Sequence, residues 1–477
     1  MIKIARIAVT LGLLSSLGAQ AYAAGLVVND NDLRNDLAWL SDRGVIHLSL
    51  STWPLSQEEI ARALKKAKPS YSSEQVVLAR INQRLSALKA DFRVTGYTST
   101  DQPGTPQGFG QTQPADNSLG LAFNNSGEWW DVHLQGNVEG GERISNGSRF
   151  NANGAYGAVK FWNQWLSFGQ VPQWWGPGYE GSLIRGDAMR PMTGFLMQRA
   201  EQAAPETWWL RWVGPWQYQI SASQMNQYTA VPHAKIIGGR FTFTPFQSLE
   251  LGASRIMQWG GEGRPQSFSS FWDGFTGQDN TGTDNEPGNQ LAGFDFKFKL
   301  EPTLGWPVSF YGQMIGEDEA GYLPSANMFL GGVEGHHGLG KNAVNWYVEA
   351  HDTRTNMSRT NYSYRHHIYK DGYYQQGYPL GDAMGGDGQL IAGKVELITE
   401  DNQRWSTRLL YAKVNPENQS INKAFPHADT LKGVQFGWSG NVYQSVRLNT
   451  SLWYTNANNS DSDDVGASAG IEIPFSL

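Results

Sequence analysis

The feature that most constrains the fold of this sequence is a two-residue alternation of apolar and polar side chains, which recurs from Asp91 to Leu477. Along 130–139, WDVHLQGNVE, one face is apolar or glycine and the other is polar or charged. The segments 237–244 and 292–300 repeat this pattern. Because successive side chains of a strand point to opposite faces, each segment is predicted to be a strand. Alternation fits a soluble sandwich as well as a membrane barrel, so the connections have to distinguish the two.

The connections between the predicted strands alternate between short and long. Short ones fall near 124–128, 163–164, 214–215, 245–248, 302–307, 340–343, 401–403 and 443–445. Long ones run near 100–117, 140–153, 172–206, 228–233, 261–288, 319–326, 356–388, 416–430 and 458–464. Short turns on one side and long loops on the other are typical of outer-membrane barrels, whose short turns face the periplasm. Eight short and nine long connections join 18 strands, and merging or splitting one hairpin would give 16 or 20. The even count places both chain ends on the periplasmic side.

The beginning of the chain has the composition of a secretory signal. A positively charged start precedes an apolar run from Ile7 to Leu17 and then Ala21-Tyr22-Ala23, which predicts a cleavable signal peptide over 1–23. Beyond it no apolar stretch approaches the roughly 20 residues of a membrane helix, which excludes a helical membrane protein. The chain has no cysteine, so it has neither disulfides nor thiolate metal sites. Its net charge of −7 disfavours nucleic acid as a partner.

Residues 24–90 have a helical period instead. Leu33, Leu37 and Leu40 share one face of a first helix. Ser56 opens a second helix with a capping box, and apolar residues from Val77 to Leu88 recur at helical spacing in a third. The predicted organisation is therefore a signal peptide over 1–23, a periplasmic helical bundle over 24–90 and a barrel over 91–477.

Two motifs carry a resemblance to a known family. They are QWWGPG at 173–178, closely followed by GSLI at 181–184, and STWPLS at 51–56, which leads into a helix. Together with the signal, the helical segment and the barrel pattern, they make the whole chain resemble the Wzi family of capsule assembly proteins. One departure is the terminal aromatic of the last strand, which is displaced to Phe475. The resemblance implies an outer-membrane barrel that is closed by a periplasmic helical bundle. It also implies that the protein binds group 1 capsular polysaccharide, helps to retain it at the cell surface and has no catalytic site.

The long connection 172–206 is rich in large apolar side chains. An 18-stranded barrel leaves an aqueous lumen unless something fills it. Since such a loop would be costly to leave in water, we expect it to fold into the lumen. Trp174, Trp175 and Tyr179 then have two interpretations, which are packing in a plug or a platform on which sugar rings stack. We prefer plug packing and keep a secondary sugar contact as the alternative.

The connection from Thr353 to Gly388 combines many cationic and tyrosine side chains in an acidic protein. Arginine forks bind carboxylates, and capsules of the group that the family binds contain uronic acids. We therefore predict direct contact with an acidic polysaccharide through Arg354, Arg359, Tyr362, Tyr364, Arg365, His367, Tyr369, Lys370 and Tyr373. The alternative is a loop folded over the barrel mouth, its arginines paired with luminal acids such as Asp131 and Glu139.

Catalysis and metal binding have less support. A glycosidase would recruit Glu180 and Asp187 as acid and base about 5 to 10 Å apart across a cleft, but acidic pairs at such spacing are common. Adjacent His366 and His367 in an extended segment would point to opposite sides, which disfavours a shared metal ion. Two acidic loops lack the fixed spacing of a calcium site: Asp279, Asp284 and Glu286, and Asp461, Asp463 and Asp464. We predict no enzyme activity, no metal and no cofactor.

These patterns together predict an all-β transmembrane barrel of 18 antiparallel strands in the bacterial outer membrane, with cell-surface loops and a periplasmic helical domain. The predicted function is that of a lectin that anchors acidic capsular polysaccharide. Other expected partners are outer-membrane lipid, lipopolysaccharide and, at the helical bundle, the capsule export machinery. The alternative is a sugar-selective porin, whose lumen would conduct oligosaccharides.

Overall fold

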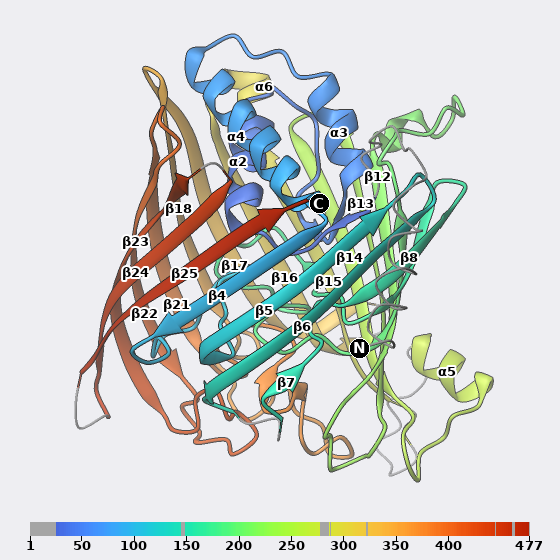
Figure 1. Cartoon of the computed structure of the whole chain (residues 1–477). Helices are drawn as coiled ribbons and strands as arrows, with labels where there is room; N and C mark the ends of the chain where they lie inside the picture. The colour runs from blue at the N-terminus through green and yellow to red at the C-terminus, as the bar shows by residue number, and fades with distance from the viewer. Residues whose placement is uncertain are drawn as a thin grey trace, which may run out of the picture.

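The computed structural model describes residues 25–144, 148–276, 286, 288–320, 323–443, 445–459 and 463–476 (Figure 1). The predicted signal peptide lies outside these residues, as do Asp279, Asp284 and Asp461 of the two acidic loops. Nearly half of the described chain forms antiparallel strands around an interior that loop segments cross.

Eighteen strands of the described residues close into one barrel, and a nineteenth, the two-residue β7 (Phe150–Asn151), pairs on the side of β6. Closure joins the last strand to the first, where Phe475 lies opposite Phe92. The barrel strands are β4 (Phe92–Ser99), β5 (Ala115–Ser126), β6 (Trp130–Glu142), β8 (Tyr156–Phe161), β9 (Gln164–Gly169), β11 (Gly194–Arg199), β12 (Trp216–Gln224), β13 (Lys235–Phe246), β14 (Leu249–Trp259), β15 (Gly288–Lys299), β16 (Val308–Ala320), β17 (Leu323–Leu339), β18 (Asn342–Asp352), β21 (Gln389–Ile398), β22 (Arg404–Val414), β23 (Asp429–Tyr443), β24 (Val446–Ala457) and β25 (Asp464–Phe475). The predicted fold class and number of strands are confirmed.

The outer face of the barrel is apolar. On β6, Leu134 and Val138 point outward and are 54% and 53% exposed, whereas His133 and Glu139 point inward and are buried. The same alternation exposes large apolar side chains on other strands, among them Leu121, Ile220, Phe296, Val348, Leu409 and Leu452. An apolar surface of this extent around a closed barrel is suited to lipid rather than to water.

Three helices precede the barrel: α2 (Asn31–Asp42), α3 (Gln57–Lys65) and α4 (Ser72–Leu88). Asp30 caps α2 by accepting a hydrogen bond from the Leu33 amide at 2.9 Å, and Ser56 caps α3. Their apolar faces form one buried cluster with Ala343 and Ile398 of the barrel wall. Figure 1 shows the helices gathered at the end of the barrel where the C-terminus lies. None of the described helices combines the length and the apolar composition that crossing a membrane requires.

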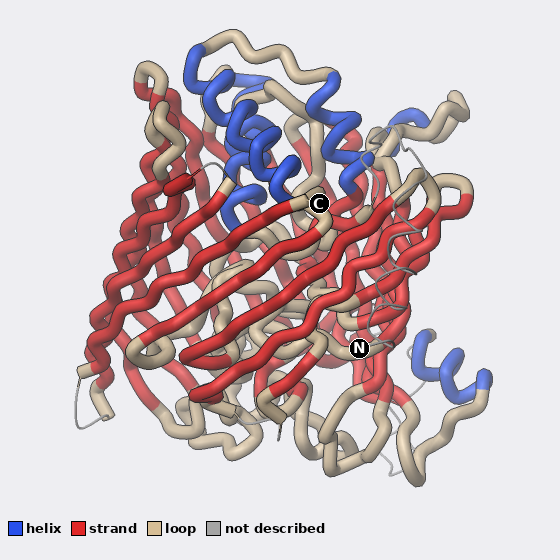
Figure 2. Tube along the Cα trace, in the orientation of Figure 1, coloured by secondary structure: helices blue, strands red, loops and turns tan. Residues whose placement is uncertain are grey.

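Loop segments occupy the lumen, as Figure 2 shows in tan. Short strands tie them together in pairs: β10 (Trp174–Trp175) with β2 (Thr52–Trp53), β1 (Leu26–Val27) with β3 (Leu55–Ser56), and β19 (Tyr374–Gln375) with β20 (Tyr378–Pro379). Three further helical segments lie in connections between barrel strands: η1 (Arg211–Val213), α5 (Phe268–Phe275) and α6 (Glu301–Leu304).

Two predicted connections were wrong in their limits. The segment predicted to fold inward as a whole, 172–206, contains barrel strand β11, which pairs with β9 and β12. The plug is therefore limited to 170–193, and a connection from 200 to 215 replaces the predicted turn at 214–215. The predicted long connection at 319–326 is also wrong, because β16 and β17 stay paired as far as Ala320 and Leu323.

Candidate functional site

The two tryptophans of the plug are buried in packing contacts and are not exposed to a ligand. Trp174 and Trp175 are 2% and 0% exposed, and β10 pairs them with β2 near the helices. The indole N–H of Trp175 donates to Gln219 Oε1 at 2.7 Å. Gly176 adopts a φ of 144°, and a Cβ there would lie 2.7 Å from Gln313 Nε2, so the turn after the tryptophans requires glycine.

Tyr179, the third aromatic of the plug, is also enclosed. Its ring stacks on Tyr347 with centroids 4.8 Å apart, and its hydroxyl donates to Glu334. Its exposed fraction is 7%. The three plug aromatics therefore lie where the packing interpretation expects them.

The loop at 353–388 divides the nine predicted contact residues into two groups. Tyr364, Tyr369 and Tyr373 are 0% exposed, and their hydroxyls donate to backbone carbonyls at 2.6, 3.1 and 2.7 Å. Burial raises the pKa of Tyr369 to about 12. As buried members of the lumen packing they do not reach a polymer outside, so the prediction of direct contact is wrong for these three tyrosines.

The other six members lie on or near the surface of the loop. Arg359, Arg365, His367 and Lys370 are exposed, whereas Arg354 and Tyr362 are half-buried. Arg354 pairs with Asp352, the last residue of β18, at 2.6 Å. The Arg359 guanidinium lies 3.9 Å from the ring centre of Tyr362. Arg365 Nη1 donates to Asn361 Oδ1 at 2.9 Å.

The proposed pairing of loop arginines with Asp131 and Glu139 is wrong. Asp131 accepts hydrogen bonds from the Leu26 amide and the Tyr156 hydroxyl, at 3.1 and 2.8 Å. Glu139 forms an ion pair with Arg190 of the plug at 2.7 Å. The exposed loop arginines therefore remain available to an external anion.

The two adjacent histidines do not point to opposite sides, because their segment is not extended. The rings of His366 and His367 lie 4.5 Å apart and both approach Glu286. Burial, followed by the neighbouring His367 and Arg264, lowers the pKa of His366 to about 4. Its Nδ1 accepts from the amides of Ile368 and Tyr369, which leaves the proton of the neutral ring on Nε2, the atom that faces Glu286. In this tautomer the Nε2–H faces the Glu286 carboxylate at 3.4 Å, so Nε2 has no lone pair to offer a metal ion.

The two carboxylates considered for catalysis have different surroundings. Arg408 Nε donates to Glu180 at 2.9 Å and the Tyr347 hydroxyl donates at 2.6 Å. Burial opposes ionisation of Glu180, but Arg408 outweighs it and holds its pKa below the ordinary value. Asp187 instead lines a cavity, and its burial raises its pKa to about 6. Glu180 is not on that lining, so these residues do not form the facing acid and base that hydrolysis uses.

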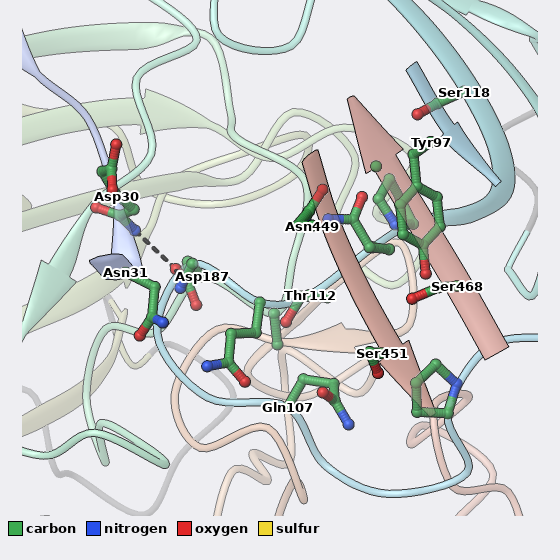
Figure 3. Close-up of a pocket in the computed structure, with 18 of the residues that line it drawn as sticks. Asp30, Asn31, Tyr97, Gln107, Thr112, Ser118, Asp187, Asn449, Ser451 and Ser468 are labelled. Atoms are coloured by element: carbon green, nitrogen blue, oxygen red, sulfur yellow. Dashed lines mark hydrogen bonds between the residues drawn. The ribbon is translucent and has the colours of Figure 1, made fainter. Parts of the chain in front are cut away.

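The cavity that Asp187 lines has a volume of about 670 Å³ and lies in the lumen, between the plug and the inner faces of β21–β25 and β4–β6. Figure 3 shows its wall, from which Tyr97, Asn449, Ser451 and Ser468 project. These residues were not among those predicted from the sequence. The two-residue alternation was the available signal, because it assigns Tyr97 to the same face of its strand as Arg93 and Thr95. The alternation predicts which face of the strand a residue lies on, but it does not predict whether a cavity lies beside that face.

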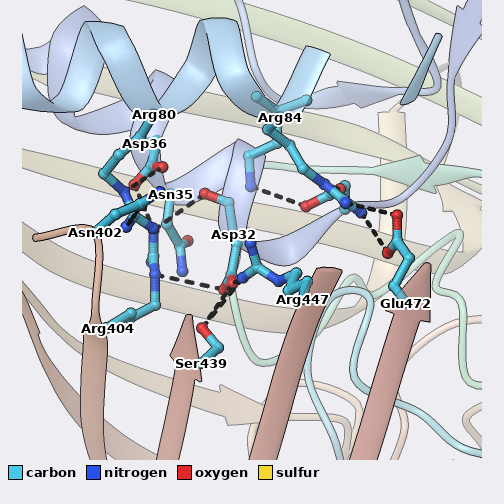
Figure 4. A network of polar contacts seen from close by, with 12 residues as sticks. Asp32, Asn35, Asp36, Arg80, Arg84, Asn402, Arg404, Ser439, Arg447 and Glu472 are labelled. Carbon is cyan, nitrogen blue, oxygen red and sulfur yellow. Dashed lines mark hydrogen bonds and ion pairs between the residues drawn. The ribbon is translucent and has the colours of Figure 1, made fainter. Parts of the chain in front are cut away.

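Ion pairs border the cavity at the helical end (Figure 4). Arg84 of α4 bridges Asp30 and Glu472, with N···O distances of 2.6 and 2.8 Å. Burial opposes ionisation of Asp30, but Arg84 and then Arg447 outweigh it and lower its pKa. A neighbouring group joins the helices to β21–β24 through Asp32, Asp36, Arg80, Glu396, Arg404 and Arg447. This network connects the helices to the barrel wall.

Comparison with known proteins gives consistent results. The family model described as Capsule assembly protein Wzi matches residues 89–469. A Klebsiella pneumoniae protein, described as an uncharacterized 55.8 kDa protein in the cps region, is 97% identical over the whole of this chain and 95% of its own length. The solved structure of Escherichia coli Wzi is described as an outer membrane protein involved in group 1 capsule assembly and a carbohydrate-binding β-barrel. It is 93% identical, with a TM-score of 0.91 over 95% of this chain and 100% of that one. The chain described above, an outer-membrane β-barrel with a filled lumen, therefore belongs to the Wzi family of capsule assembly proteins.

Proposed function

We propose that this protein is a lectin that binds capsular polysaccharide and anchors the capsule to the cell surface. The observation that carries the proposal is its 93% identity, over nearly the whole chain, to a barrel described as carbohydrate-binding and involved in group 1 capsule assembly. The TM-score of 0.91 shows that the two chains also share their fold closely. The relative from a cps region supports the same process.

The proposed orientation places the helical bundle in the periplasm and the long connections at the cell surface. Its support is the general arrangement of outer-membrane barrels, in which short turns face the periplasm. The helices lie at the short-connection end, where Arg43 of the helical region donates to the His336 carbonyl at 3.2 Å. In this orientation the apolar outer face contacts outer-membrane lipid and lipopolysaccharide. Lys65, Lys66 and Lys68, which are exposed, face the periplasm, where the capsule export machinery would meet them.

The proposed surface contact with the polysaccharide is the exposed part of the 353–388 loop. Arg359, Arg365, His367 and Lys370 present cationic or ionisable groups to solvent, and Tyr362 adds an aromatic ring. A guanidinium binds a carboxylate through two parallel hydrogen bonds. Uronic acids in the polysaccharide would supply such carboxylates at intervals along the chain, so several modest contacts would add up through multivalency.

Charge reversal of the loop tests this contact. With Arg359→Glu combined with Arg365→Glu, we expect cells to release most of their capsule while the amount of barrel in the membrane is unchanged. Lys341→Glu is the control, because Lys341 is also an exposed cation but lies at the short-connection end, paired with Glu400. Capsule retained on washed cells is the measurement. Retention by the double variant equal to that of wild type and of Lys341→Glu would remove this loop from the binding surface.

The porin alternative has a separate electrical test. The packed lumen favours the lectin, because Trp175, Tyr364 and Tyr373 are fully buried in one cluster with residues of the barrel wall. We expect the intact purified protein to give no stable conductance steps in a planar bilayer and to bind capsule in solution. Stable ion-conducting steps would favour the porin instead.

A further inference from the structure

One side of the lumen contains an aromatic ring that packing does not explain. Tyr97 projects from the inner face of β4, where its neighbours across the strands are Ser118 on β5 and Gly470 on β25. It is half-buried. Within the described residues no other ring stacks on it, and no group forms a hydrogen bond with its hydroxyl. Since serine and glycine are too small to cover it, the face of the ring is open to the cavity.

The row across the strands continues from Gly470 to Asn449 on β24. Asn449 is exposed to the lumen, and Figure 3 shows its amide, the Tyr97 ring and the Ser468 hydroxyl projecting into the same space. An aromatic face beside an amide and hydroxyls is the combination that suits a pyranose, whose C–H face packs on a ring while its hydroxyls donate and accept hydrogen bonds.

The opposite wall of the cavity supplies an independent observation. Asn29 Oδ1, Thr112 Oγ1, Gln173 Oε1 and Asp187 Oδ1 belong to lining residues, and these buried oxygens have no hydrogen-bond partner in the described protein. Buried polar atoms in native proteins are almost always satisfied by protein, by water or by a ligand. Four such oxygens in the lining residues show that the polar groups of this wall are incompletely satisfied within the described protein, as expected beside a site that exchanges hydrogen bonds with water or a ligand.

The size and the ends of the cavity restrict what can enter it. A volume of about 670 Å³ falls within the range of ligand sites, roughly 300 to 1,000 Å³. Pro103 and the exposed Arg143 line it at the long-connection end, whereas the Arg84 to Glu472 and Arg447 to Asp32 ion pairs lie at the helical end. A chain that enters from the long-connection end meets this network and cannot pass through. The site therefore suits the end of a glycan chain or a side branch, and not the middle of a polymer.

We propose that this cavity is a glycan-binding subsite that takes the terminal pyranose residues of an oligosaccharide, with Tyr97 as the stacking platform and Asn449 and Ser468 as hydrogen-bond partners. The proposal rests on the lectin function and adds a second contact to the surface loop. The loop holds acidic polymer at several points along its length, whereas the subsite holds one end. Two glycans have the required chemistry, namely the capsular polysaccharide and the core oligosaccharide of lipopolysaccharide.

The test measures binding of two probes to the full-length protein in detergent by isothermal titration calorimetry. One probe is a set of short oligosaccharides released from group 1 capsule by partial acid hydrolysis, and the other is lipopolysaccharide core oligosaccharide. We expect Tyr97→Ala to weaken binding on the order of tenfold, which corresponds to about 1.4 kcal/mol. Tyr97→Phe should retain most of the binding, since it keeps the stacking ring and the Tyr97 hydroxyl has no hydrogen-bond partner among the described residues. Tyr411→Ala is the matched control, because Tyr411 lies on the outer face of β22.

A second variant, measured together with a folding assay, separates loss of binding from loss of folding. Asn449→Trp should fill the cavity and abolish binding of the short probes, while heat-modified mobility on gels reports an intact barrel. Binding of the capsule fragments supports the subsite and assigns it to capsule, and binding of the core oligosaccharide alone supports it and assigns it to lipopolysaccharide. If wild type binds capsule polymer but neither short probe, or if Tyr97→Ala binds as tightly as wild type, the subsite is overturned while the lectin function stands. If it binds neither polymer nor short probes, the lectin function falls as well.

Discussion

The two halves of the lumen differ in how far apolar side chains fill them. In what we call the packed half, the inner faces of β13–β17 carry Ile236, Ile256, Leu291, Ile315 and Met328, which enclose the plug and the buried tyrosines. In the polar half, the inner faces of β23–β25 and β4–β6 carry serine, threonine, asparagine and glutamine around a cavity. Both halves obey the same two-residue alternation, so the barrel pattern alone does not say what a luminal aromatic does. Trp175 and the buried tyrosines of the packed half are structural, whereas Tyr97 of the polar half has the exposure that our proposed ligand site requires.

The largest expected effect is in the packed half. Trp175→Ala removes a fully buried indole and its hydrogen bond to Gln219. Truncation of a buried tryptophan typically costs about 3 to 5 kcal/mol of folding free energy. We expect a correspondingly lower midpoint in denaturant unfolding followed by tryptophan fluorescence, with a loss of barrel from the outer membrane. A midpoint within error of wild type would show that the plug packing does not stabilise the barrel.

The second largest loss of stability is expected for a substitution at the boundary between the two halves. Glu180 joins them, because it accepts from Tyr347 of the packed half and from Arg408 on the cavity wall. Glu180→Gln leaves the buried Arg408 without an anion, and breaking a buried pair in this way costs about 3 to 5 kcal/mol. We expect a value near the lower limit, since the amide oxygen still accepts one hydrogen bond. The matched variant is Glu58→Gln, whose partner Lys160 is partly exposed and whose loss should matter less. Equal unfolding midpoints for the two variants would contradict this ranking.

Asp187→Asn should act in the opposite direction. Burial raises the pKa of Asp187 to about 6 from the ordinary 3.8, so the folded protein holds its proton more tightly than the unfolded chain. Its contribution to stability is therefore present below about pH 4 and is lost as the pH rises to about 6. At pH 7.5 the neutral amide should stabilise the fold by about 1 to 3 kcal/mol, and at pH 4 it should have little effect. Unfolding midpoints at the two pH values measure this. The same gain at both would show that the charge is not the cause.

The barrel itself was predictable because its determinants are local. Each strand has its own alternation, and the outward face is apolar in β6 as in most other strands. The limits of β11 were not predictable in the same way. Gly194–Arg199 has apolar residues that also suit a luminal plug, and only its pairing with β9 and β12 makes it a strand of the wall. That pairing depends on neighbours distant in sequence.

The candidate site was predictable in composition but not in exposure. The 353–388 loop was correctly placed among the long connections, yet its tyrosines separate into buried and accessible ones according to contacts with Leu183, Ile184 and Gly260. Those contacts come from other connections, so no local pattern reports them. Tyr97 is the opposite case, because it was not predicted as a contact residue. Its sequence pattern marks it only as an inward residue of β4, and its proposed role depends on the space left by Gly470 and Ser118 across the strands.

The smallest change in stability is expected for Tyr97→Ala, and its contrast with Trp175→Ala compares the two halves most directly. Tyr97→Ala removes an aromatic ring, as Trp175→Ala does, but this ring is half-buried, lies beside small residues and has no hydrogen bond to protein in the described chain. Substitutions with so few contacts usually change stability by less than about 1 kcal/mol. We therefore expect an unfolding midpoint close to wild type for Tyr97→Ala, next to the large loss for Trp175→Ala. A loss at Tyr97 as large as that at Trp175 would mean that the polar half also depends on aromatic packing, and that its cavity is enclosed by structure rather than kept for a ligand.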